Sequence, residues 1–473
     1  MTSYSDSLQL PVLYSDHMVL QRDKPFEVSG VGGHEEVLVR FAGLELHAHV
    51  CNGKWAVKVP ALPAGGPYCM EISSNSDRLV YNDVWMGDVW LCSGQSNMEY
   101  PLSRAATAEA DLKAVCNNPR LHLFNMLERY ITDEKRWSDD ACAEVAAHRY
   151  FDTTSGWEYA HSDNAARFSA IAYHFGRLLS HETGVHIGLV LNAVGGSTCE
   201  SWIQNKILLQ NVPFILDDWH HNEWIQPWVI QRAIENAGTQ THPYQPGYLF
   251  KAGIEPLKHT MLKGVIWYQG ESNAHNISLH EVLFPMMVAC WRSFFNDDCL
   301  PVYFVQLSSV QRSTWPAFRN SQLLISEQIS HCWMAVSSDC GEADNVHPAA
   351  KRPIGERLAH AALHHTYGMK HVVPSGPLRR GAYVCDRKVY VVFDYADGLQ
   401  PSNGNEILGF EVCDGGYWYK AEAKVVGQTI QLFFPGILQP TAVRYGWQPY
   451  SQGNLINSAG LPASTFKLKI DVK

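Results

Sequence analysis

Residues 89–98 read VWLCSGQSNM, and this stretch decides the fold. Four apolar residues that end at Cys92 run without interruption into a turn of small and polar residues. Continuous apolar runs of this length are typical of parallel strands that are covered on both faces, whereas half-exposed strands alternate. Further runs of the same kind occur at 186–194, 264–270, 301–307 and 333–337. The pattern predicts a parallel sheet.

Segments with helical periodicity separate these apolar runs. Apolar residues recur every three or four positions within 167–182, 280–294 and 354–365. Because strands that alternate with helices are typical of α/β proteins, we expect an α/β domain over residues 85–368. Two segments inside it are rich in Trp, Asp and His without clear periodicity, and we interpret them as insertions at a cleft rim: 127–165 and 210–248.

Both ends of the chain show a different pattern. Between residues 10 and 84, short segments alternate between apolar and polar residues and are separated by turn residues such as Asn52-Gly53, which is typical of a β-sandwich. The alternation returns at 388–396, 406–415, 429–436 and 464–472. We therefore expect three parts: an N-terminal β module at 1–84, the α/β domain at 85–368 and a C-terminal β module at 369–473.

The composition excludes several classes of protein. Of 473 residues, 46% are hydrophobic, which indicates a large core rather than disorder. The formal net charge is −10 and no cluster of Lys and Arg interrupts it, so nucleic acid is not an expected partner. No apolar run approaches the ~18 residues that span a bilayer, and Met1–Asp16 lacks the basic start and apolar run of a signal peptide. The 15 Trp and 21 Tyr suit sugar-stacking clefts, although aromatic β-domain cores explain them equally well.

The cysteines and histidines do not predict a metal site. Twelve Cys are dispersed without a CxxC pair, which favours buried free thiols. The best metal candidate among the 22 His is His360 with His364, four positions apart on a predicted helix, but no third ligand stands at a recognisable spacing. We therefore expect neither a metal nor another cofactor.

Two segments that follow predicted strands carry candidate catalytic residues. Ser96 lies in a tight turn after the first strand, where its hydroxyl can face a cleft. This turn is not the GxSxG elbow, because Met98 replaces the second Gly. In the sequence DNVHP, Asp344 precedes His347 by three residues, so its carboxylate can hold Nδ1 while Nε2 accepts a serine proton. Alternatively, Asp344 caps the following helix and His347 is a surface residue.

Two further segments offer neutral hydrogen-bond donors. Gly195-Gly196 follows the strand at 186–194, and the sequence WYQGESN at 267–273 ends another strand. An N–H from a glycine turn and a side-chain amide can together hold an oxyanion. Alternatively, the glycines form an ordinary βα turn and Glu271 is a loop carboxylate. All four segments lie at carboxyl ends of predicted parallel strands, where open α/β sheets carry their sites.

The blocks SGQSNM, GGS, WYQGESN and DNVHP resemble those of the SGNH hydrolase superfamily, in the form found in the sialate O-acetylesterase family and related carbohydrate acetylesterases. The resemblance extends to 15–25, 64–72, 83–98 and 454–466, and thus over nearly the whole chain. It implies an SGNH-like three-layer α/β/α core with β modules at both ends. The sequence LFKAGI at Leu249–Ile254 departs from the family, which usually shows something like LYNGMI there.

The resemblance also implies roles for particular residues. Ser96 is the expected nucleophile, His347 the general base and then acid, and Asp344 the residue that orients His347. The expected oxyanion donors are the N–H groups of Ser96 and of Gly195 or Gly196, and a side-chain amide, for which we favour Gln269 over Asn273. Candidates for substrate contacts are Gln95, Glu271, Glu200 and Trp202. The last two are equally well explained as a helix-start carboxylate and a packed Trp.

The implied activity is removal of O-acetyl groups from sialic acids through an acetyl-enzyme. Acetylated xylan or another glycan is the alternative substrate, and a non-catalytic glycan-binding protein is the alternative of another class. The expected partner is thus an acetylated carbohydrate, and the sequence does not address the oligomeric state. The family resemblance implies a periplasmic, secreted or lysosomal location, whereas the expected free thiols suit a reducing compartment. The given sequence shows no signal peptide, which a mature form with its signal removed would explain equally well, so the location stays open.

Overall fold

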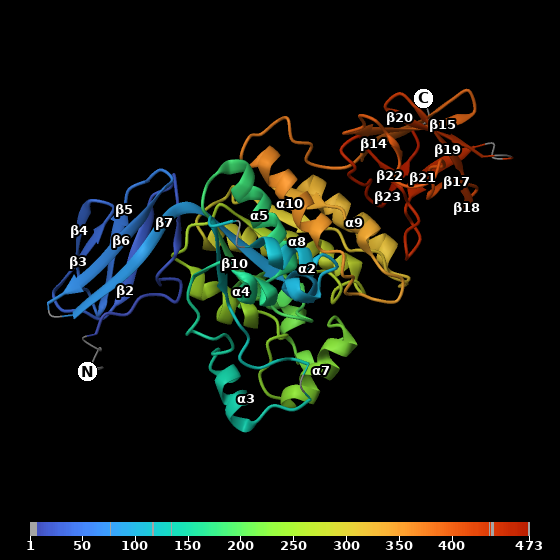
Figure 1. Cartoon of the computed structure of the whole chain (residues 1–473). Helices are drawn as coiled ribbons and strands as arrows, with labels where there is room; N and C mark the ends of the chain where they lie inside the picture. Colours follow the sequence, from blue (N-terminus) through green and yellow to red (C-terminus); the bar gives the residue numbers. More distant parts are fainter. Residues whose placement is uncertain are drawn as a thin grey trace. The chain divides into compact units, whose positions relative to one another are not determined.

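The computed structural model describes residues 7–75, 77–115, 118–133, 135–434, 436 and 439–471 (Figure 1). The chain divides into two compact units, Met1–Ile266 with Met286–Pro301 and Trp267–Pro285 with Val302–Lys473. This division passes through the predicted α/β domain, so the three-part organisation stays a prediction.

The first unit begins with short antiparallel strands in which buried and exposed residues alternate, as the sequence pattern predicts. β3 pairs with both β4 and β6, and β2 pairs with β5. The antiparallel strands are β2 (Phe26–Val31), β3 (Glu36–Phe41), β4 (Leu44–His49), β5 (Lys54–Val59) and β6 (Gly65–Ser74). The short strand β1 (Val19–Gln21) instead pairs in parallel with residues 85–87.

β7 (Asp77–Gly94) continues from these strands into the α/β part of the unit. Its first half pairs antiparallel with β6, whereas from Asp88 onward it pairs parallel with β10 (Ile187–Ala193). The burial pattern changes with the pairing, because every residue from Met86 to Gly94 is buried. The predicted boundary between residues 84 and 85 therefore falls inside one strand.

The strands of the α/β part lie in the order β11 (Gly264–Tyr268), β7, β10, β8, β9. β8 (Leu121–Asn125) is parallel to β10, while β9 (Glu158–Tyr159) is antiparallel to β8, so the sheet is mixed. α5 (Ala170–Thr183) packs closely on this sheet at Gly176, where an added Cβ would lie 2.7 Å from Leu189 and 2.8 Å from Leu121. The remaining helices include α2 (Ala108–Ala114), α3 (Asp139–Ala146), α4 (Ser162–Arg167), α6 (Asn205–Asn211) and α7 (Pro227–Ala237).

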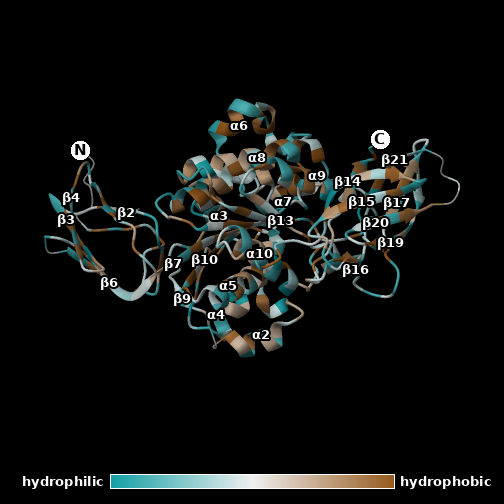
Figure 2. Ribbon diagram, turned by 90° about the horizontal axis from the view of Figure 1, so that it is seen from above, coloured by the Kyte–Doolittle hydropathy of each residue, from teal (hydrophilic) through white to brown (hydrophobic). Residues whose placement is uncertain are grey.

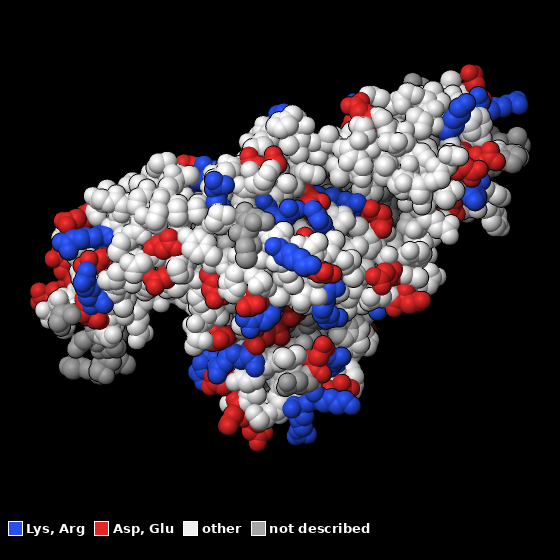
Figure 3. Space-filling view, in the orientation of Figure 1, with Lys and Arg blue, Asp and Glu red and all other residues white. Residues whose placement is uncertain are grey.

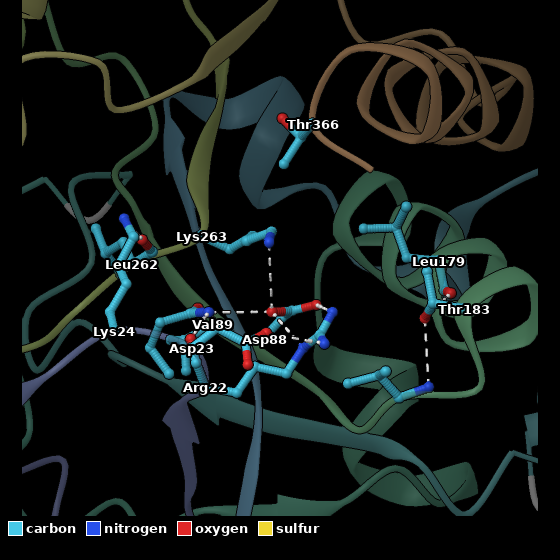
Figure 4. Close-up of polar contacts among 12 residues, drawn as sticks. Arg22, Asp23, Lys24, Asp88, Val89, Leu179, Thr183, Leu262, Lys263 and Thr366 are labelled. Atoms are coloured by element: carbon cyan, nitrogen blue, oxygen red, sulfur yellow. Dashed lines mark hydrogen bonds and ion pairs between the residues drawn. The ribbon is translucent and has the colours of Figure 1, made fainter. Parts of the chain in front are cut away.

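The side chain of Asp88, in β7, lies among the positively charged side chains of Arg22 and Lys263 (Figure 4). Its fully buried carboxylate accepts two hydrogen bonds from the Arg22 guanidinium, each at 3.1 Å, and one from Gln21 at 3.0 Å. The Lys263 ammonium lies 3.9 Å away. Two cations and an amide thus compensate the one buried negative charge.

Replacing Asp88 with alanine should lower the free energy of unfolding by about 3 kcal/mol, because it removes the one buried carboxylate that compensates the partly buried Arg22 and Lys263. The exposed Glu45, whose carboxylate pairs with Arg40 at 2.7 Å, is the matched control. Glu45→Ala should cost less than about 1 kcal/mol. Urea denaturation measures both variants, and equal losses would show that burial does not set the strength of the Asp88 cluster.

The second unit contains a parallel strand pair and a set of antiparallel strands. β12 (Val302–Val305) pairs with β13 (Cys332–Ala335), and α9 (Trp315–Gln328) and α10 (Arg352–His365) belong to the same unit. α8 (Ile277–Phe294) contributes residues to both units. In Figure 2, α9 carries both hydrophilic and hydrophobic residues, as expected for a helix with one face on a core.

Two four-stranded antiparallel sheets form the C-terminal part of the second unit. One has the order β14 (Leu378–Cys385), β15 (Lys388–Asp394), β20 (Thr429–Phe433), β19 (Glu422–Val426). The other has the order β18 (Tyr417–Lys420), β17 (Phe410–Asp414), β21 (Pro440–Tyr445), β23 (Phe466–Lys469). Pro435 and Val472, which two predicted strand segments include, lie outside the described residues.

The α/β class predicted from the sequence is confirmed, with a mixed sheet and additional β-sheets toward the C-terminus. The segments interpreted as insertions without clear periodicity contain short helices, namely α3 and the start of α4 in 127–165 and α7 in 210–248. On the face drawn in Figure 3, acidic and basic residues are interspersed, without the extended basic surface that a phosphate backbone requires. No helix among the described residues is long and apolar enough to span a bilayer.

Candidate active site

Ser96 lies where β7 ends, as the sequence predicts. Gly94 has φ of +138°, and the chain then enters a single helical turn, α1 (Ser96–Glu99). The carbonyl of the preceding Gln95 accepts the Met98 N–H at 2.8 Å and the Glu99 N–H at 3.1 Å. Gln95 itself is buried and Ser96 is half-buried, so this turn presents the serine at the edge of the sheet.

The Gly195-Gly196 turn lies beside the Ser96 turn because β7 and β10 end together. Ala193 is the register partner of Gly94, and the Val194 N–H donates to the Gly94 carbonyl at 3.1 Å. A Cβ added to Gly195 would lie 3.7 Å from Cβ of Ser96. The first unit alone therefore brings together two of the predicted site segments.

A half-buried acid that the sequence analysis did not single out, Glu99, lies at this turn. The Glu99 carboxylate is within 3.0 Å of the position that a Cβ on Gly195 would occupy, and it accepts the Gly195 N–H. Burial raises the pKa of Glu99 to about 7, although the Gly195 N–H opposes the shift. The spacing could have revealed it, because Glu99 is one helical turn after Ser96.

A second carboxyl, Glu128, belongs to the same cluster. Burial raises the pKa of Glu128 well above its usual range, and the charge of Glu99 raises it further. Burial also raises the pKa of Tyr150, and the charge of Glu128 adds to that shift. Burial and the neighbouring charge of Glu99 therefore both disfavour the ionised form of Glu128.

In the second unit, Gln269 and Asn273 lie in the turn after β11 (Gly264–Tyr268) and are joined to each other. The Gln269 amide donates to Oδ1 of Asn273 at 2.6 Å, and both side chains are buried. The Asn273 N–H donates to the Gly270 carbonyl at 2.9 Å, which closes the turn. Glu271 lies in the same turn and is 6% exposed.

His347 lies on the predicted polar loop, which leads to α10. The side chain of Asn345 holds the loop around it, since Oδ1 accepts the His347 N–H at 2.9 Å and Nδ2 donates to the His347 carbonyl at 3.1 Å. Asp344 is exposed and makes no hydrogen bond or ion pair with any residue that the structure describes. The expected Asp344–His347 contact is thus not observed.

Two of the substrate-contact candidates are deeply buried. Trp202 is inaccessible to solvent, donates to the Ser197 hydroxyl at 3.0 Å and accepts the indole N–H of Trp291 on its carbonyl at 2.9 Å. Trp202 therefore has the packing role that the sequence left open. Glu200 is 1% exposed, and its carbonyl accepts the Gly247 N–H at 2.9 Å.

The described residues contain no group of three or more His, Cys, Asp or Glu side chains that could hold a metal ion. The eleven cysteines among them are free thiols, and Cys116 lies outside this part of the chain. His364, one of the two candidate ligands, pairs Nδ1 with the carbonyl of Val372 at 2.7 Å.

An α/β core with a serine on a tight turn at the carboxyl end of a parallel strand is the arrangement typical of hydrolases that use a serine nucleophile. The comparisons place the chain among the carbohydrate esterases. The model of a family described as carbohydrate esterase, sialic acid-specific acetylesterase, matches residues 86–364. The chain belongs to this family and is an ester hydrolase.

Relatives over nearly the full length agree with the family. The chain is 28% identical over 465 residues to the sialate O-acetylesterase of Mus musculus, which covers 89% of this chain and 85% of the mouse protein. It is 26% identical to the sialate O-acetylesterase of Homo sapiens, with coverage of 92% and 85%. The crystal structure of a carbohydrate acetylesterase from Xanthomonas citri matches with a TM-score of 0.80 and 31% identity, covering 97% of this chain and 99% of the other.

Proposed function

We propose that this esterase removes O-acetyl groups from sialic acids through an acetyl-enzyme on Ser96. The observation that carries the proposal is the family match over 86–364, which includes every candidate catalytic residue. The position of Ser96, at a strand end and beside a glycine turn that offers backbone donors, supports its role as the nucleophile.

In the proposed reaction, Oγ of Ser96 attacks the acetyl carbonyl while Nε2 of His347 takes the serine proton. The C–O bond to the sugar then breaks, and the sugar oxygen leaves with the proton from His347. Water, activated by His347, hydrolyses the acetyl-enzyme and releases acetate. Asp344 is proposed to hold Nδ1 of His347, a contact that would form with substrate bound.

Hydrogen bonds within the Gly195-Gly196 turn and within the turn that contains Gln269 and Asn273 guide the choice of the oxyanion donors that we propose. Because the Gly195 N–H donates to Glu99, we propose the N–H of Gly196, together with that of Ser96. Because the amide of Gln269 donates to Oδ1 of Asn273, we propose Nδ2 of Asn273 as the side-chain donor and Gln269 as the residue that orients it. Gln95 and Glu271 remain candidates for contacts with the sugar.

A comparison of substrates tests this proposal. Acetate release from O-acetylated N-acetylneuraminic acid should exceed release from acetylated xylan by at least about tenfold in kcat/KM, a difference of ~1.4 kcal/mol in the transition state. Faster release from xylan would overturn the assignment to sialic acid. The relative from Xanthomonas citri, described only as a carbohydrate acetylesterase, is the reason to keep that second candidate.

A further inference from the structure

Two side chains that take no direct part in the proposed reaction make hydrogen bonds to the two peptide units that flank Gly195. The Glu99 carboxylate accepts the Gly195 N–H, and the Tyr244 hydroxyl donates to the Gly195 carbonyl at 2.7 Å. Both peptide units that flank Gly195 are thereby fixed. Glu99 lies one helical turn after Ser96, while Tyr244 comes from the segment 210–248.

The hydrogen bond of Tyr244 sets the direction of a different group, the N–H of Gly196. The carbonyl of Gly195 and the N–H of Gly196 belong to one trans peptide unit, so they point in opposite directions. When the Tyr244 hydroxyl fixes the carbonyl, it therefore also fixes the N–H. Rotation of this peptide would break the bond to a buried hydroxyl.

The packing at Gly196 adds to this constraint. Gly196 has φ of +79°, and a Cβ added there would clash with the Tyr244 hydroxyl. Tyr244 itself is 1% exposed, and its backbone N–H donates to Nδ1 of His242 at 3.1 Å. The tyrosine is thus a fixed support against which the turn lies.

We propose that Glu99 and Tyr244 are positioning residues for acyl transfer, which hold the Gly195-Gly196 turn so that the Gly196 N–H meets the developing oxyanion. Donors that are aimed before the reaction stabilise the transition state without reorganisation. This inference rests on the proposed function, because it requires Gly196 to be an oxyanion donor. Neither side chain needs to touch the substrate.

Tyr244→Phe tests the inference, because it removes only the hydroxyl. With an aryl acetate, kcat should fall by about 10- to 100-fold while KM changes less than about twofold, since the lost alignment matters only in the transition state. Tyr248→Phe is the matched control, because Tyr248 is 3% exposed and donates its hydroxyl to the Val145 carbonyl at 2.7 Å. The control should retain kcat.

Two substitutions of Glu99 provide an independent measurement. Glu99→Gln keeps an oxygen that can accept the Gly195 N–H and should retain kcat within a few-fold, whereas Glu99→Ala should lose about 10-fold or more. Circular dichroism confirms that each variant is folded. Equal kcat values for Tyr244→Phe and Tyr248→Phe, or for the two Glu99 variants, would overturn the inference. An inactive native chain would instead overturn the proposed function.

Discussion

Replacing Ser96 with alanine is expected to abolish acetate release from a chromogenic acetyl ester, with a loss of about 10⁴- to 10⁶-fold in kcat. The reason is that the variant lacks the hydroxyl proposed to attack the acetyl carbonyl, so acyl transfer to the enzyme cannot begin. Any residual hydrolysis would be direct attack by water on an ester whose developing oxyanion is still stabilised by the oxyanion donors. Mass spectrometry of the quenched native enzyme should show one added acetyl group, which is absent from the variant.

Ser93→Ala is the matched control for this prediction. Ser93 lies three residues earlier in the same block, is fully buried in β7, and its hydroxyl has no hydrogen-bond partner among the described residues. Its removal should leave kcat and folding nearly unchanged. Equal rates for the native chain and Ser96→Ala would contradict the nucleophile assignment. An inactive native chain that still binds glycans would favour the non-catalytic alternative.

The strands that carry the site could be predicted from sequence because burial on both faces leaves a direct signal. The runs at 89–92 and 186–194 contain almost no polar residues, and both are strands in the structure. Helix α9 was missed for the opposite reason. Its buried face mixes apolar residues with Arg319, Ser321 and Gln322, whose side chains make hydrogen bonds to other parts of the unit, so the amphipathic pattern is hard to recognise in the sequence.

The candidate site likewise contains one arrangement that the sequence predicts and one that it does not. Because parallel strands end at one edge, the sequence predicts that the turns bearing Ser96 and Gly196 are neighbours, as they are. The role of Tyr244 could not be predicted from the sequence. Its hydrogen bond to Gly195 joins residues that are 49 positions apart, and Tyr244 lies in a segment whose sequence shows no clear periodicity. Contacts of this kind depend on the path of an insertion rather than on local pattern.

His347→Ala is expected to lower kcat by nearly the same factor as Ser96→Ala, because an unassisted serine hydroxyl is a weak nucleophile. The double variant Ser96→Ala/His347→Ala should be no slower than either single variant, since the two residues act as one unit. His371→Ala is the control, because His371 is an exposed histidine in the same unit of the structure. Independent, multiplying losses in the double variant would contradict a shared catalytic role.

Asp344→Asn extends this test to the third residue of the proposed triad. If Asp344 orients His347 when substrate is bound, the loss in kcat should be about 10⁴-fold, because the amide favours the wrong imidazole tautomer. A loss below about tenfold would instead fit the exposed position of Asp344 in the structure, where it has no described partner. The loop would then act through Asn345, whose two hydrogen bonds to the backbone of His347 already fix that residue. The ratio of the Asp344→Asn and His347→Ala rates therefore decides which side chain orients the base.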